Sequence, residues 1–353
     1  MNAVRDQSID IARGIAILAI VLGHVLRGLA SAGVVDPDSD GVQLTDAMLY
    51  TFHLSVFAFV AGLFVQRAIV RDGALSYVVN RDALFIYLYV LWSLLQGGVK
   101  LVTGALVNSP TSVADILQLW RPEGQLWFLP FLIVMTTAAA IIRPWRNRVL
   151  AVSTVVATVL VSAIVWGTDF GYAGTQGIAL SGFFFVGLLV RSDRLNRVIS
   201  RIGTVISVAS IAVMGGSYML LITQRLATAP TTGGDDRTLL SVLLGILASG
   251  LGVGTVLLLS RLLSKLGRAA QWLSFIGTRT LEIFLAHIIA ASGARIVLEL
   301  IGVGSPVVHI SVGLIAGVTL PLILWWLGQK LRINFLFDWP FTRIVTAPRR
   351  EQV

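Results

Sequence analysis

The chain contains no cysteine and few charged residues for its length. Of its 353 residues, 13% are charged and 56% are hydrophobic, whereas a soluble globular protein has about 25% charged residues. The absence of cysteine excludes disulfides, thiolate nucleophiles and cysteine-ligated zinc or iron–sulfur sites. The low charge, with a mean hydropathy of +0.85, argues against a soluble protein and is typical of a bundle of membrane helices.

Ten apolar segments approach the length of about 20 residues that a membrane-spanning helix needs. They are Ile9–Leu29, Ala47–Val65, Ala83–Leu106, Leu126–Ile142, Val149–Trp166, Gly177–Val190, Ile202–Ile222, Leu239–Ser260, Leu281–Ile301 and Val307–Leu327. The sixth segment is short and rich in glycine. We therefore expect an all-α membrane protein with about ten transmembrane helices. Residues 1–353 are predicted to form a single transmembrane domain without a separate soluble domain.

The net charge is +9, and the positive residues lie in short loops between the apolar segments. This placement indicates that they set the membrane topology and argues against nucleic-acid binding. If alternate loops are assigned to opposite sides, one side holds 21 of the 27 Lys and Arg residues. The positive-inside rule then places both termini in the cytoplasm of a plasma-membrane protein. The expected partner is the lipid bilayer, and the sequence predicts no particular oligomeric state.

The sequence Ala30-Ser31-Ala32 resembles a signal-peptide cleavage site. However, the apolar run before it is long for a signal peptide, and its charged flank sums to zero. His24 also interrupts that run. We therefore expect the first helix to be retained.

The first predicted span carries three ionisable residues on one face. Such groups are costly inside a membrane and usually face a cavity or a partner. Asp10 and Arg13 are three residues apart, so they are neighbours on a helix and can pair. His24 follows Arg13 after three turns plus roughly 20°, about 16 Å further along the helix axis. The span therefore presents a polar stripe from its cytoplasmic end toward its outer half, although Arg13 alone could also be a snorkelling topology marker.

The second predicted span brings another histidine to the same depth. His53 lies about 9 Å below the outer edge, and His24 about 8 Å below it on the preceding antiparallel helix. Because imidazole titrates near neutral pH, the two are candidates for a proton-handling pair. The alternative for His53 is a structural hydrogen bond between helices.

Three further residues have less decisive patterns. His287, in the ninth span, suits helix packing or substrate lining equally well. Trp127, at the outer start of the fourth span, is another candidate for substrate lining, although tryptophan there is most often part of an interfacial belt. His309 lies near the outer boundary, where we expect an interfacial role. The four histidines fall at three depths, so no metal site is expected.

Four motifs, in this order, resemble landmarks of the acyltransferase-3 family of membrane acyltransferases. The first matches a family signature in which an arginine is followed, after ten residues, by a histidine. The motifs are Asp10-Ile11-Ala12-Arg13-Gly14 with Leu22-Gly23-His24, Phe52-His53-Leu54-Ser55-Val56-Phe57, Leu126-Trp127-Phe128-Leu129, and Phe275-Ile276-Gly277 with Leu281-Glu282-Ile283-Phe284-Leu285-Ala286-His287. Together they cover almost the whole chain. The spelling of the third motif leans slightly toward the fucose 4-O-acetylase-like branch.

The resemblance implies transfer of an acyl group, usually acetyl, from cytoplasmic acyl-CoA to a hydroxyl of a cell-envelope carbohydrate at the outer face. His24 would be the general base or would itself carry the acyl group. Arg13 would bind the phosphates of the donor or hold Asp10. The cationic residues Arg67, Arg71 and Arg81 would attract the CoA phosphates, or would serve only as positive cytoplasmic loops.

The chain departs from the family pattern in two places. Leu54 and Ser55 follow His53 where the family has Met-Pro, and Arg81-Asp82 stands where a denser arginine-rich stretch precedes a proline. The second departure falls in the stretch where the resemblance implies contacts to the donor. A different functional class, a secondary transporter or flippase for a glycan or lipid, would predict inverted repeats and broken helices, and neither is evident. A membrane scaffold would leave the polar stripe unexplained.

Overall fold

The structure is a computed structural model that describes residues 7–104, 111–231, 237–341 and 344–345. Every regular element in these ranges is a helix, which confirms the all-α prediction. Nine of the described helical segments are long and apolar enough to cross a membrane. They are α1 (Gln7–Ser31), α2 (Asp40–Asp72), α3 (Ala74–Thr103), α5 (Phe128–Ile142) with the flanking 3-10 turns η2 (Gly124–Trp127) and η3 (Pro144–Arg146), α6 (Arg148–Val165), α9 (Thr204–Thr223), α10 (Leu239–Ser264), α12 (Thr280–Leu300) and α13 (Pro306–Leu331).

The predicted sixth span is shorter than a full crossing. It consists of the turn η4 (Ile178–Leu180) and the ten-residue helix α7 (Ser181–Val190). α7 packs closely on α2, because a Cβ added at Gly62 would overlap the carbonyl oxygen of Phe184, and one at Gly187 would overlap that of Phe59. The ten predicted spans therefore become, within the described residues, nine long helices and one short apolar helix.

Several short elements were not predicted. They are α4 (Val113–Ile116), α8 (Ser192–Arg201), η5 (Gly267–Ala270), α11 (Gln271–Thr278) and η6 (Asn334–Leu336). α11 crosses α1 with the two backbones in contact, since a Cβ at Gly277 would overlap the carbonyl oxygen of Asp10, and one at Gly14 that of Leu273. Only Arg279 separates α11 from α12, so this crossing also sets the height of α12 beside α1.

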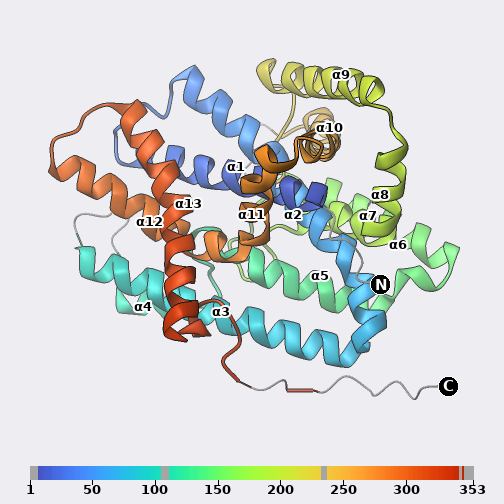
Figure 1. Ribbon diagram of the computed structural model, residues 1–353, viewed down its shortest axis with the longest axis horizontal. Helices are drawn as coiled ribbons and strands as arrows, with labels where there is room; N and C mark the ends of the chain where they lie inside the picture. Colours follow the sequence, from blue (N-terminus) through green and yellow to red (C-terminus); the bar gives the residue numbers. More distant parts are fainter. Residues whose placement is uncertain (1–6, 105–110, 232–236, 342–343, 346–353) are drawn as a thin grey trace.

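The helices differ in how much of their surface the protein covers. α1 and α2 lie at the centre of the bundle and are mostly buried, whereas α6 and α9 lie at its edge and are mostly exposed (Figure 1). The exposed faces of α6 and α9 carry valine and leucine, including Val152, Leu160 and Val213. In a bilayer, such faces contact lipid without penalty, so polar residues rather than apolar ones are concentrated toward the interior.

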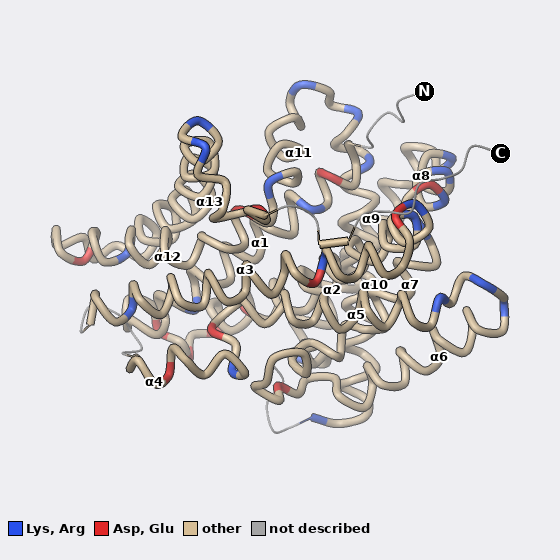
Figure 2. Tube along the Cα trace, turned by 90° about the horizontal axis from the view of Figure 1, so that it is seen from below, with Lys and Arg blue, Asp and Glu red and all other residues tan. Residues whose placement is uncertain are grey.

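Charged residues are unevenly distributed over the bundle. Figure 2 shows Lys and Arg gathered near α8, near α11 and at one end of α13, along one edge of the molecule, whereas Asp and Glu are spread more widely, with several near α4 at the opposite edge. This asymmetry is the spatial counterpart of the loop pattern in the sequence.

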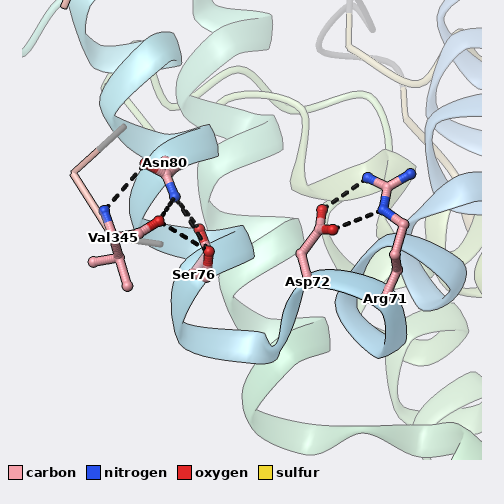
Figure 3. A network of polar contacts seen from close by, with 5 residues as sticks. All are labelled: Arg71, Asp72, Ser76, Asn80 and Val345. Atoms are coloured by element: carbon pink, nitrogen blue, oxygen red, sulfur yellow. Dashed lines mark hydrogen bonds and ion pairs between the residues drawn. The ribbon is translucent and has the colours of Figure 1, made fainter. Parts of the chain in front are cut away.

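The segment after α13 runs back along α3. The Tyr87 hydroxyl donates to the carbonyl oxygen of Phe335 at 2.9 Å, and the Trp92 indole donates to that of Leu336 at 2.7 Å. Nearer the start of α3, the Asn80 amide donates to the carbonyl oxygen of Val345 at 2.8 Å (Figure 3). These bonds hold the segment against the wall of the bundle next to the cavities described below.

Candidate active site

Two histidines from helices far apart in the sequence lie side by side inside the bundle. The ring centroids of His24 on α1 and His287 on α12 are 5.2 Å apart, with 51° between the ring planes. The sequence singled out both residues but did not predict their contact. Their proximity follows from the α1–α11 crossing, which aligns the start of α12 with the start of α1.

The hydrogen bonds of His287 define its tautomer. Its Nδ1 lies 3.0 Å from the carbonyl oxygen of Ile283 and 2.9 Å from that of Phe284. Because a carbonyl oxygen only accepts, Nδ1 carries the hydrogen and donates it. In a neutral ring Nε2 then has a free lone pair, and this atom is buried and has no hydrogen-bond partner among the described residues. His287 therefore has the atom needed to accept a proton, next to His24.

Tyr50 connects His24 with His53. Its ring lies 4.7 Å from that of His53 and 6.1 Å from that of His24, edge-on in both cases. The guanidinium of Arg27 lies over the Tyr50 ring at 3.3 Å. Arg27 also forms a two-point ion pair with Asp46, at 2.6 and 2.7 Å. His24 and His53 thus belong to one cluster with Tyr50 and His287, in which each of the two contacts the Tyr50 ring. Proton handling by His24 and His53 as a pair stays a prediction.

Two cavities approach this cluster from opposite ends of α1. We call them the Arg13 cavity and the Arg27 cavity after the arginine of α1 in each wall. The Arg13 cavity has a volume of about 430 Å³, and the Arg27 cavity about 360 Å³. On α1, Ile20 lines the first and His24 the second, one turn later; on α12, Phe284 lines the first and Ile288 the second. The histidine pair therefore lies at the level where one cavity gives way to the other.

The Arg13 cavity has apolar walls with cationic residues among them. Arg13 donates from Nη2 to the Thr280 hydroxyl at 2.6 Å. Arg71 and Arg81 line the same cavity, and the Arg81 guanidinium lies over the Phe85 ring at 4.5 Å. Three of the arginines predicted to bind the donor are thus in one wall.

The fourth, Arg67, lies in a neighbouring cavity of about 330 Å³, which it lines with Arg71 and Arg191. Because Arg71 belongs to both cavities, the two adjoin. Arg71 is also bonded to Asp72 at 2.7 and 2.8 Å (Figure 3), so its charge is partly neutralised.

In the wall of the Arg27 cavity, three basic residues each have an acidic partner. Arg27 pairs with Asp46 at 2.6 Å. Lys100 pairs with Glu123 at 2.5 Å, and Arg295 with Glu299 at 2.8 Å. Ser31, Thr103 and Ser292 add hydroxyl groups to this wall. The cavity therefore offers hydrogen-bonding groups without a large excess of positive charge.

A comparison with protein-family models found a match to the acyltransferase-3 family, described as an acyltransferase domain, over residues 6–326. The chain belongs to this family. It is therefore a multi-pass membrane acyltransferase. The comparison with curated proteins found no match, and neither did that with solved structures.

Besides Arg67, four predicted site residues of this acyltransferase-3 protein line neither cavity: Asp10, His53, Trp127 and His287. Substrate lining by Trp127 and His287 therefore stays a prediction. Asp10 is buried, and its carbonyl oxygen faces Gly277 at the α1–α11 crossing; its pairing with Arg13 stays a prediction. Trp127 is buried against Gly177, with its ring 5.7 Å from that of Phe128. Phe128, rather than Trp127, lines the Arg13 cavity.

His309 is separate from the histidine cluster of the acyltransferase. It lies in the first turn of α13 and is buried, with only 2% of its surface exposed. Its Nε2 donates to the carbonyl oxygen of Val303 at 2.8 Å, which closes the loop between α12 and α13. Among the described residues, no group of three or more His, Asp or Glu side chains is placed to hold a metal ion.

Several residues of the site were not predicted from the sequence. Tyr50 could have been found, because it precedes His53 by three residues and so lies on the same helix face. Gln96 and Gln125 could not, since they act across helices: their amides donate to the carbonyl oxygens of Leu285 at 3.0 Å and Phe284 at 3.2 Å. Both bonds hold α12 at the level of His287.

Proposed function

We propose that the protein transfers an acyl group, most simply acetyl, from cytoplasmic acyl-CoA to a hydroxyl of a cell-envelope carbohydrate. The observation that supports this is the His24–His287 pair between two cavities of different character. A base at the junction of two separate cavities suits a reaction between two substrates that arrive from opposite sides. The asymmetry of Lys and Arg supports a cytoplasmic position for both termini and for the Arg13 cavity, in the plasma membrane.

The Arg13 cavity is the proposed donor site. Its apolar walls suit the thioester arm of acyl-CoA, and Arg71 and Arg81 would bind phosphate oxygens by charge-assisted hydrogen bonds. Arg67 and Arg191 in the adjoining cavity would extend this contact to the remaining phosphates. A polyanionic donor would also be attracted by the local excess of positive charge.

The Arg27 cavity is the proposed acceptor site, and His24 in its wall is the proposed base. As the acceptor hydroxyl attacks the thioester carbonyl carbon, its proton passes to His24. The carbon–sulfur bond then breaks, and the proton passes from His24 to the departing thiolate, which leaves as CoA. The neighbouring His287 ring, whose centroid lies 5.2 Å from that of His24, would limit the orientations of the His24 ring by packing against it.

A second route would begin with attack of His24 itself on the thioester, giving an acyl-imidazole that the acceptor hydroxyl then cleaves. The two routes differ in an observable way. Acid quenching of a reaction with labelled acetyl-CoA, in the absence of acceptor, would trap label on the protein only if the second route operates.

The test of the proposal uses purified protein, labelled acetyl-CoA and envelope saccharide. We expect labelled saccharide with the native protein and a loss of rate of about 10²–10⁴-fold in His24→Ala, the range for loss of a general base. His309→Ala is the matched control, because it removes a buried histidine of the same protein outside the cluster. Equal rates for His24→Ala and the native protein would refute the assignment of His24.

A further inference from the structure

An apolar groove lies beside the Arg27 cavity. It is bounded by α3, α12 and α13, and its volume is about 670 Å³. Its wall contains aliphatic side chains and one tryptophan, Trp92, whose indole N–H is already bonded to the carbonyl oxygen of Leu336. A ligand in the groove would therefore contact hydrocarbon, and no lining side chain among the described residues has a free hydrogen-bonding group.

Small residues on one face of α12 create this space. Ala286, Ala290, Gly293 and Ala294 line the groove at spacings of three to four residues, which places them along one helix face. The lining on α12 extends from Ala286 to Leu298, a length of roughly 18 Å at 1.5 Å per residue. This is close to the depth of one leaflet, about half of a 30 Å hydrocarbon core.

The groove and the Arg27 cavity share part of their walls. Val99, Ile289 and Gly293 line both. The space between the groove and the Arg27 cavity is open at Gly293, because a Cβ added there would meet no atom within 4 Å. The groove begins at Ala286, next to His287, so it runs from the level of the histidine pair toward the end of α12 that carries the acceptor cavity.

We infer that the acceptor is a lipid-borne hydroxyl compound, with its polar head in the Arg27 cavity and its hydrocarbon tail in the apolar groove. This inference rests on the proposed function and specifies its acceptor. A water-soluble saccharide would need the polar cavity alone, whereas a lipid uses both compartments and crosses between them beside Gly293. Tail binding would also place the hydroxyl at a constant depth, next to His24.

The test changes the groove without changing the histidines. Gly293→Leu puts a side chain into the shared wall, and leucine favours a helix more than glycine does. Ala294→Phe fills the groove alone, because Ala294 does not line the Arg27 cavity. Gly216→Leu in α9 is the matched control, since a Cβ there also meets nothing within 4 Å. Thermal melting and binding of acetyl-CoA establish that each variant is folded.

Membranes from cells that produce the protein are incubated with labelled acetyl-CoA and extracted with chloroform–methanol, and His24→Ala membranes provide the background. We expect the label in the organic phase, and a decrease of about tenfold in Gly293→Leu and Ala294→Phe, the factor that lost burial of about two methylene groups gives. Gly216→Leu should match the native protein. Mass spectrometry of the organic phase would identify the labelled lipid.

Failure of this inference and failure of the proposed function would give different results. Label that is transferred only to material outside the organic phase, or lipid labelling that both groove variants leave unchanged, would overturn the lipid-borne acceptor and leave the proposed acyl transfer intact. No transfer to any fraction by the native protein, despite binding of acetyl-CoA, would overturn the proposed function and this inference with it.

Discussion

The two cavities that meet at the histidine pair differ in whether all of their basic residues form ion pairs. Arg71 of the Arg13 cavity pairs with Asp72. In the described part of the chain, Arg81 of that cavity and Arg67 beside it form no ion pair, and Arg81 lies instead over an aromatic ring. In the Arg27 cavity each of the three basic residues has an acidic partner. A cation without a counterion attracts an anionic ligand, whereas a paired cation supplies hydrogen-bond donors with little net field. The contrast fits a polyanionic donor on one side and a hydroxyl-bearing acceptor on the other.

The largest difference between the cavities should appear when a basic residue is removed from each. We expect Arg81→Gln to raise the KM for acetyl-CoA about tenfold, because a hydrogen bond to a charged group contributes about 1.5–3 kcal/mol. Lys100→Gln, the same kind of change in the Arg27 cavity, should leave that KM unchanged. Initial rates at low and high salt would measure both effects. An equal rise in both variants would remove the distinction between the cavities.

A smaller effect is expected from loss of one acidic partner in the Arg27 cavity. Asp46→Asn leaves the Arg27 guanidinium over Tyr50 without its counterion. The pair is partly exposed, 38% for Arg27 and 28% for Asp46, so its contribution is about 1 kcal/mol or less. We expect a rise of about fivefold in the KM for the acceptor and none in that for acetyl-CoA.

Asp40→Asn is the control for that variant. Asp40 pairs with Arg225 on the surface, with 94% of the Asp40 side chain exposed, so its loss should change neither KM. If Asp46→Asn instead raised the KM for acetyl-CoA, the proposed sides of donor and acceptor would have to be exchanged.

The smallest effect concerns a residue that lines neither cavity. Gln125→Leu removes the amide that donates to the Phe284 carbonyl oxygen at 3.2 Å. We expect the free energy of unfolding to fall by about 1 kcal/mol, with both KM values unchanged, as thermal melting and initial rates would show. Gln118→Leu is the control, because its amide makes only a long, exposed contact with Asp115 at 3.5 Å. A selective change in one KM would show that Gln125 belongs to one substrate site.

The long helices were predictable because each needs only a sustained apolar run, a property of neighbouring residues. The short helices were less predictable from the sequence. α8 is rich in charge and α11 has only eight residues, so neither produces a membrane-spanning signal. The length of α7 was visible in the sequence, but its close packing on α2 depends on glycines of two separate segments.

The part of the site that lies on a single helix could be predicted from the sequence. The shared face of Arg13 and His24 comes from helix periodicity, and both line cavities. The contact of His24 with His287 depends instead on how α11 places α12, and no local pattern encodes that. The pairing of Arg27 with Asp46 crosses the turn between two helices, and helix periodicity alone does not indicate it.

At the crossing of α1 and α11, main chain touches main chain at Gly14 and Gly277, and no side chain acts as a spacer. Any sliding of α11 along α1 would have to move the backbone of both helices. The contact therefore holds Arg13 beside Thr280 and His24 beside His287. We therefore expect random mutagenesis to find Gly14 and Gly277 among the least permissive glycines, together with Gly62 and Gly187 at the crossing of α2 and α7. By contrast, a Cβ added at Gly28 or Gly293 in the wall of the Arg27 cavity would meet no atom within 4 Å, so substitutions there change the cavity and leave the helix crossing intact.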